Sequence, residues 1–219
     1  MDRKKILQLV KSPPALSDTP VAQPYYRLLE EGLWPLTSKV ARDPDIYTAA
    51  SLLAALLVPM GFWLHPLVGA FLMMASGLFD TMVEVAARES GLDSPLGAFL
   101  NSCMDRVRDF LFLFGFWVLF FGADDPLPGS GLIFSSFLLI SLFNYTRTRA
   151  TALGVEIPPG FMERGFRTIY LIFWAVLLGF FPASRDSVLW GGLFLFDLLI
   201  MAALAGRIVL IQAELQVRK

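Results

Sequence analysis

Long apolar stretches separated by short polar segments are the main pattern of this sequence. Residues 46–79 contain no Asp, Glu, Lys or Arg, and His65-Pro66 interrupts the stretch near its middle. A helix needs about 20 apolar residues to cross the hydrocarbon core of a bilayer. We therefore expect two membrane-spanning helices here, joined by a tight turn at His65-Pro66. Further spans are predicted at 95–121, 131–147, 166–182 and 188–210.

Turn residues separate the third and fourth predicted spans. The segment 122–131 is rich in Gly, Asp and Pro, a composition typical of turns. The whole pattern predicts an all-α integral membrane protein with six transmembrane helices. It divides the chain into an N-terminal arm, residues 1–44, and a membrane domain, residues 45–219.

The composition agrees with a membrane protein. Hydrophobic residues make up 56% of the 219 residues and charged residues 17%, whereas soluble domains average about 45–50% and about 25%. The net charge of −1 provides no basic field for nucleic acid. The single cysteine excludes an intramolecular disulfide and a multi-cysteine metal cluster.

Basic residues lie almost entirely on one side of the predicted membrane domain. The arm, the loops on that side and the C-terminal end contain every Lys and Arg except three. Arg185 lies on the opposite side, and Arg106 and Arg108 lie within the third span. Because loops rich in Lys and Arg stay in the cytoplasm, we expect an inner (cytoplasmic) membrane protein with both termini cytoplasmic.

The N-terminal arm contains its own helical pattern. Apolar residues recur at roughly helical spacing between residues 21 and 40, with charged residues between them. This pattern predicts an amphipathic interfacial helix on the cytoplasmic leaflet. A helix that packs on the protein without membrane contact is equally consistent with it.

Two predicted spans carry polar residues at four-residue intervals, which place them on one helix face. They are Asp80, Glu84 and Arg88 in the second span, and Asn101, Asp105 and Asp109 in the third. Gly97 precedes Asn101 at the same spacing. Asp80 and Asp105 both lie roughly 12–15 Å from the cytoplasmic end, given the rise of a helix. Two carboxylates at matching depth indicate a cation site. A buried ion-pair cluster with Arg106 or Arg108 is the alternative.

The segment 76–115 resembles the signature of the CDP-alcohol phosphatidyltransferases, D-x2-D-G-x2-A-R-x8-G-x3-D-x3-D. Its first Asp, the A-R pair, the later Gly and the last Asp fall on Asp80, Ala87-Arg88, Gly97 and Asp105, without a gap. The segment 145–167 is similar to a second family pattern, Y-x-R-A-R-A-E-x-L-G…G-x-x-E-R-x-x-R. The resemblance extends from about residue 20 to the C-terminus.

This resemblance implies a six-helix fold with an amphipathic arm, and a homodimer. Family members transfer a phosphatidyl group from CDP-diacylglycerol to an alcohol and release CMP. Their four motif carboxylates hold divalent cations, Mg²⁺ or Mn²⁺, that bind the diphosphate, which suits hard ions with oxygen ligands. The last Asp serves as general base, which makes Asp105 the predicted catalytic residue.

Three positions depart from the family signature. The second Asp is Val83, the following Gly is Glu84, and the third Asp is Asn101. The metal ligands predicted for this chain are therefore Asp80, Asp105, Asn101 and Glu84. Because the family's Gly leaves space for the nucleotide, a Glu side chain at this position would fill it.

Arginines of the second family segment suit the binding of phosphate oxygens. The substrate-binding residues implied by the resemblance are Arg88, Gly97, Arg147, Arg149, Arg164 and Arg167. They favour a phosphorylated polyol, glycerol 3-phosphate or inositol phosphate, as the acceptor. Alternatively, the arginines of the segment 145–167 only anchor the protein to anionic phospholipid headgroups.

Two functions follow from these features. The first is a CDP-alcohol phosphatidyltransferase of phospholipid biosynthesis. The second is a catalytically degenerate family member that serves as a lipid-binding or structural subunit of a larger membrane complex. Asp197, in the last predicted span, either replaces a lost ligand or makes a structural hydrogen bond to a neighbouring helix.

Overall fold

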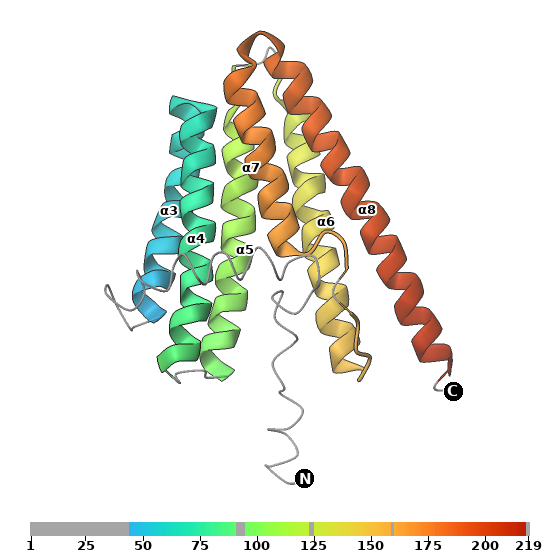
Figure 1. Cartoon of the computed structure of the whole chain (residues 1–219). Coiled ribbons are helices and arrows are strands. Elements are labelled where there is room, and N and C mark those ends of the chain that lie inside the picture. Colours follow the sequence, from blue (N-terminus) through green and yellow to red (C-terminus); the bar gives the residue numbers. More distant parts are fainter. Residues whose placement is uncertain (1–43, 91–94, 123–124, 159, 218–219) are drawn as a thin grey trace.

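The computed structural model describes residues 44–90, 95–122, 125–158 and 160–217, which form a bundle of helices (Figure 1). The helices are α3 (Pro44–Leu64), α4 (Pro66–Ser90), α5 (Pro95–Val118), α6 (Leu127–Ala152), α7 (Arg164–Phe180) and α8 (Arg185–Val217). A single 3-10 turn, η2 (Pro182–Ser184), precedes α8. The all-α prediction is thus confirmed for these residues, whereas the predicted interfacial helix at 21–40 lies outside them.

Four segments of this bundle are long and apolar enough to cross a membrane, which is fewer than the six spans predicted. They are Pro44–Leu64, Pro66–Val83, Leu127–Ala152 and Pro182–Gln216. Charged side chains in its middle, among them Asp105 and Arg108, lower the apolar character of α5. The 17 residues of α7 make it shorter than a typical span. The most buried charged side chains of these two helices, Arg108 and Asp109 of α5 and Arg167 of α7, lie inside the bundle.

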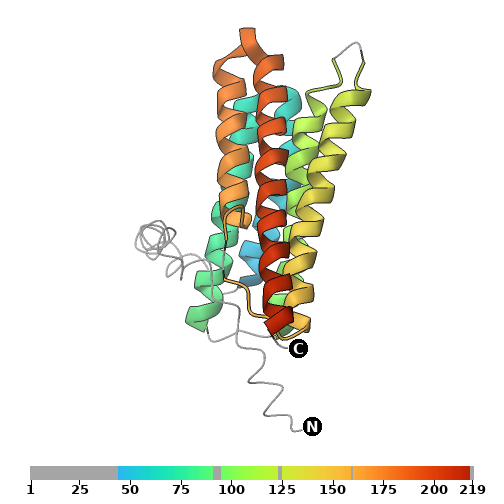
Figure 2. The same ribbon diagram turned by 90° about the vertical axis from the view of Figure 1, so that its right-hand side faces the viewer.

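Each helix of the bundle packs on two neighbours, and α3 lies between α4 and α5 in this order. His65 alone separates α3 from α4, which confirms the predicted tight turn, and these two helices form an antiparallel pair. Helix α5 packs on α3 and α6, α7 packs on α4 and α8, and α6 packs on α8. The α3–α4 and α7–α8 turns lie at one end of the bundle, and the C-terminal end of α8 lies at the other (Figures 1 and 2).

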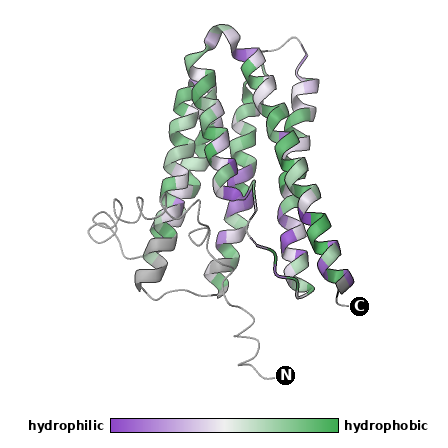
Figure 3. Cartoon of the chain, turned by 45° about the vertical axis from the view of Figure 1, so that its right-hand side comes forward, coloured by the Kyte–Doolittle hydropathy of each residue, from purple (hydrophilic) through white to green (hydrophobic). Residues whose placement is uncertain are grey.

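Apolar side chains cover much of the outer surface of the bundle. Several large apolar side chains are 60–69% exposed, namely those of Leu53, Trp63, Phe71, Phe134 and Phe194. Figure 3 shows helices that are largely green, with the largest purple patch inside the lower half of the bundle. An apolar exterior around a polar interior is the arrangement expected for a protein surrounded by lipid.

Helix α6 begins earlier than the sequence predicts, and a Pro and a Gly determine its two ends. The helix begins at Leu127, so residues 127–131 are helical rather than part of a turn, because Pro128 is tolerated in a first helical turn. At the other end, Gly154 has a φ of 76°. Its N–H donates to the Thr151 carbonyl, and the Val155 N–H donates to the Ala150 carbonyl, which is a Schellman motif.

Replacing Gly154 with Ala should lower the free energy of unfolding by about 1 kcal/mol, because a Cβ disfavours positive φ. Gly206→Ala in α8 is the matched control, since an added Cβ there meets nothing within 4 Å, and it should leave stability unchanged or raise it. Unfolding of the detergent-solubilised protein in SDS measures both. Equal effects of the two substitutions would contradict this account of the α6 end.

Candidate functional site

The structure brings the two predicted carboxylates, Asp80 of α4 and Asp105 of α5, to the same pair of arginines. Arg164, the first residue of α7, places one nitrogen 2.7 Å from Oδ2 of Asp80 and the other 2.8 Å from Oδ1 of Asp105. Arg108 of α5 also forms an ion pair with Asp80, and its Nη2 lies 2.5 Å from Oδ1 of Asp105. The two carboxylates thus lie close together on neighbouring parts of the bundle, and the ion pairs with Arg108 are those of the alternative prediction, a buried ion-pair cluster.

Arg108 lies at the centre of this site. Its side chain is 3% exposed, and it donates to Asn101 Oδ1 at 3.1 Å and to Ser51 Oγ of α3 at 2.6 Å. Ser51 and Ser76 are fully buried, and the hydroxyl of each donates to the backbone carbonyl of the other. The carboxylate site, defined as Asp80, Asp105, Asn101, Arg108 and Arg164, thus connects α4, α5 and α7 with each other and with α3.

The position of the missing second Asp belongs to the apolar core. Val83 is 9% exposed and lies in a small cluster with Tyr47, Met82 and Ala86. Helix α4 also contains Glu84 and Arg88, whose side chains are outside the described part of the structure, so their predicted roles stay predictions. The same holds for the nucleotide-side role of Gly97, which lies on the exposed side of α5.

All side-chain oxygens of the carboxylate site except Oδ2 of Asp105 contact cations. Both carboxylate oxygens of Asp80, Oδ1 of Asp105 and Oδ1 of Asn101 contact guanidinium nitrogens. Among the described residues there is no group of three His, Cys, Asp or Glu side chains that would hold a metal ion. Two carboxylates and two guanidinium groups also balance in charge. The described residues therefore do not fit a divalent cation in this arrangement.

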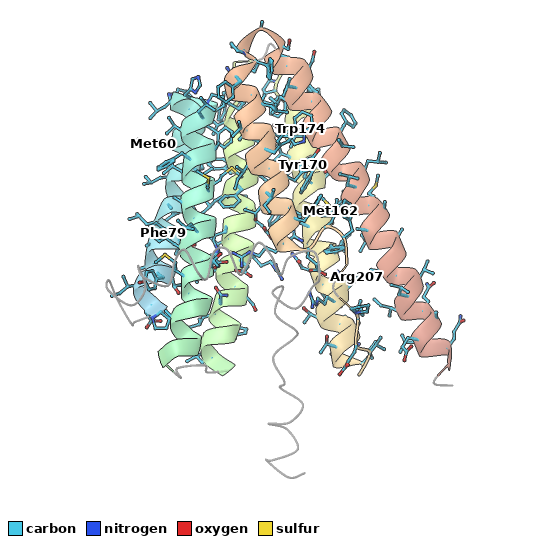
Figure 4. The ribbon with its side chains drawn as sticks, viewed as in Figure 1. Met60, Phe79, Met162, Tyr170, Trp174 and Arg207 are labelled. Atoms are coloured by element: carbon cyan, nitrogen blue, oxygen red, sulfur yellow. The ribbon has the colours of Figure 1, made fainter. Side chains whose placement is uncertain are left out.

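A second ionic cluster joins the α6–α7 connection to α8. Glu163 accepts a hydrogen bond from Arg147 at 3.1 Å and one from Arg207 of α8 at 2.5 Å. The Arg207 guanidinium also lies 3.5 Å from the centre of the Phe143 ring and donates to the Phe143 carbonyl. Figure 4 labels Arg207 and Met162 on this side of the bundle, below Tyr170 and Trp174. Of the arginines predicted to bind phosphate, Arg147 is therefore paired with a carboxylate, and Arg149 is exposed.

Arg167 lies in a different environment from the one expected of a phosphate ligand. It is 1% exposed, and it donates to Asp109 of α5 at 3.1 Å and to the Met162 carbonyl at 2.9 Å. Met162 has a φ of 66°, which is uncommon for a residue with a side chain. Arg167 thus stabilises a strained backbone and neutralises a buried carboxylate, which favours a packing role over phosphate binding.

Asp197 makes structural hydrogen bonds to a neighbouring helix, which is one of the two roles predicted from the sequence. It accepts hydrogen bonds from Ser135 and Ser136 of α6, the second at 2.5 Å. These contacts join α8 to α6, away from the contacts of Asp80 and Asp105. Sequence reasoning missed Glu163, Arg207 and Ser51 as partners in the polar interior. Of these three residues, Glu163 had a signal in the sequence, because it matches the Glu of the second family segment.

Comparison with known proteins found several relatives, although no family model matches the chain. An archaetidylinositol phosphate synthase of Aeropyrum pernix is 34% identical over 62% of this chain and 67% of the relative. An uncharacterised protein of Aquifex aeolicus is 33% identical over 78% of this chain and 87% of its own. A phosphatidylinositol phosphate synthase of Mycobacterium tuberculosis is 33% identical over 61% of this chain and 63% of the relative.

Solved structures of the M. tuberculosis phosphatidylinositol phosphate synthase have a similar fold. The structure with CDP-DAG bound matches 88% of this chain and 94% of its own, with a TM-score of 0.66 and 26% identity. A second, in complex with manganese and citrate, has the same TM-score and identity and covers 85% of this chain and 88% of its own.

Replacing Arg167 with Met should destabilise the protein by about 3–5 kcal/mol, because Asp109 would lose its buried partner. The remaining cation near Asp109 is Arg106, 3.8 Å away with a side chain 43% exposed. The double variant Arg167→Met/Asp109→Leu should recover part of this loss, because no buried charge is left unpaired. Unfolding of each variant in SDS measures the effect. A double variant at least as unstable as the single one would contradict this assignment.

Proposed function

Because this chain belongs to the CDP-alcohol phosphatidyltransferase family of phospholipid biosynthesis, we propose that it transfers a phosphatidyl group from CDP-diacylglycerol to a phosphorylated polyol and releases CMP. The observation that carries the proposal is that the family's first and last motif carboxylates, Asp80 and Asp105, lie together in the bundle beside Arg164. A structural relative with CDP-DAG bound supports the donor, and relatives named inositol phosphate lipid synthases support the acceptor class.

Asp105 is the residue we assign as general base. Its side chain is 17% exposed, and both arginines contact its Oδ1. Oδ2 is therefore the oxygen that would accept the proton of the acceptor hydroxyl. The hydroxyl oxygen then forms a bond to the phosphorus of the phosphatidyl group, while the bond from that phosphorus to the CMP oxygen breaks. General bases of this kind contribute about 10²–10⁴-fold to a rate.

Arg164 is the residue we assign to the diphosphate. Its side chain is 21% exposed, whereas that of Arg108 is 3% exposed, so Arg164 is the more accessible of the two cations. A guanidinium group binds phosphate oxygens in the same fork geometry that it uses for carboxylates. Arg147 and Arg149, on the last turns of α6, are the remaining candidates for the phosphate of the acceptor.

The expected location of this reaction is the cytoplasmic side of the inner membrane. Arg147 and Arg149 lie on the last turns of α6, and Arg164 begins α7, so these arginines border one connection between helices. Loops rich in Lys and Arg remain cytoplasmic. We extend the family's homodimer to this chain on resemblance alone, and its lipid partners would be CDP-diacylglycerol and anionic phospholipids.

A catalytically degenerate, lipid-binding or structural subunit is the second candidate function. Specific observations favour it: Val83 lies in an apolar cluster where the family has a carboxylate, and both remaining carboxylates are paired with arginines. The first candidate requires that substrate draw Arg164 away from the carboxylates. The second requires only that the fold and its lipid-facing surface persist.

Release of CMP from CDP-diacylglycerol by the purified protein tests the choice between these functions. With glycerol 3-phosphate or inositol phosphate as acceptor, we expect release that falls by about 100-fold or more in Asp105→Asn, because the general base is lost. Asp186→Asn, exposed at the start of α8, is the matched control and should retain activity.

Absence of release from folded wild-type protein with both acceptors would refute the transferase and favour the degenerate subunit. Release that Asp105→Asn leaves unchanged would instead refute the assignment of the base. The ability of the variants to fold is checked by their unfolding in SDS.

A further inference from the structure

We propose that the guanidinium group of Arg108 takes the place of a divalent cation between Asp80 and Asp105, so that this chain holds its motif carboxylates together without a metal ion. The inference uses the same family alignment as the proposed function. Its readout is metal binding, whereas the readout of that function is CMP release, so either can fail without the other.

The surroundings of Arg108 are those of a bound cation. Oxygen atoms of Asp80, Asp105, Asn101 and Ser51 surround it, and they come from three helices, α3, α4 and α5. At 3% exposure the guanidinium group has little access to water. Its positive charge is therefore stabilised by these oxygens, as that of a metal ion would be.

The oxygens around Arg108 are also those that the family signature assigns to cations. Asp80, Asn101 and Asp105 occupy its first, third and last carboxylate positions. A cation bound between Asp80 and Asp105 would have to displace a side chain that is buried on α5 and contacts both of them. Arg108 and a metal ion therefore compete for the same ligands.

The departures from the signature fit this exchange in charge. Val83 and Asn101 replace two of the family's four carboxylates, and Glu84, whose side chain lies outside the described part of the structure, adds one at the position of the family's Gly. Among the described residues, the two remaining motif carboxylates, Asp80 and Asp105, are balanced by Arg108 and Arg164. An unpaired charge inside an apolar bundle is expensive. Because arginine carries a single positive charge, its replacement of a divalent cation requires that the number of carboxylates around it also falls.

Binding of Mn²⁺ alone, measured by electron paramagnetic resonance of the free ion, tests the proposal. Wild-type protein should bind no Mn²⁺ that depends on Asp80, and its melting temperature should be the same in Mn²⁺ and in EDTA. Arg108→Ser should melt at a lower temperature in EDTA, bind Mn²⁺, and regain part of the lost melting temperature when the ion binds. Adding Asp80→Asn to Arg108→Ser should abolish both responses.

Arg185→Ser, an exposed arginine at the start of α8, is the matched control and should behave as the wild type. Mn²⁺ binding by the wild type that disappears in Asp80→Asn would overturn the proposal. So would a folded Arg108→Ser variant that binds no Mn²⁺. If Arg108→Ser does not fold, the comparison of wild type with Asp80→Asn still decides, and Arg108→Lys, which keeps the charge, should fold without a Mn²⁺ response.

Discussion

The need to neutralise charge inside an apolar bundle is the constraint on which the rest of this structure depends. Asp80 and Asp105 are buried or nearly so, and both contact Arg108 and Arg164. A carboxylate without a partner would cost several kcal/mol in this environment. The same ion pairs connect α4, α5 and α7, so they determine both how these helices meet and which groups a substrate would encounter.

The other polar clusters follow the same rule along the bundle. Asp109 pairs with Arg167, Glu163 pairs with Arg207, and Asp197 receives two serine hydroxyls. The first two pairs neutralise charge, whereas Asp197 is stabilised by hydrogen bonds alone, and all three contacts join segments that are distant in the sequence. This explains how α5, which carries four charged residues, is a helix of the bundle although it is too polar to qualify as a span.

Apolar periodicity predicted the helices well, because a helix in lipid must satisfy its backbone internally. It predicted the turn at His65 and the proximity of Asp80 to Asp105, since both follow from counting residues along a helix. It placed the start of α6 too late, because a Pro-rich segment is typical of turns but Pro128 lies in the first helical turn, where proline is tolerated. The partners Glu163 and Arg207 lie 44 residues apart, and such contacts depend on tertiary packing that periodicity does not encode.

An experimental structure determined from protein saturated with Mn²⁺ tests the central claim most directly, because the anomalous scattering of manganese locates the ion. We expect Arg108 to contact Asp80 and Asp105, with no manganese between these carboxylates. A manganese ion bound to Asp80 and Asp105, with the Arg108 side chain turned away from both, would contradict it.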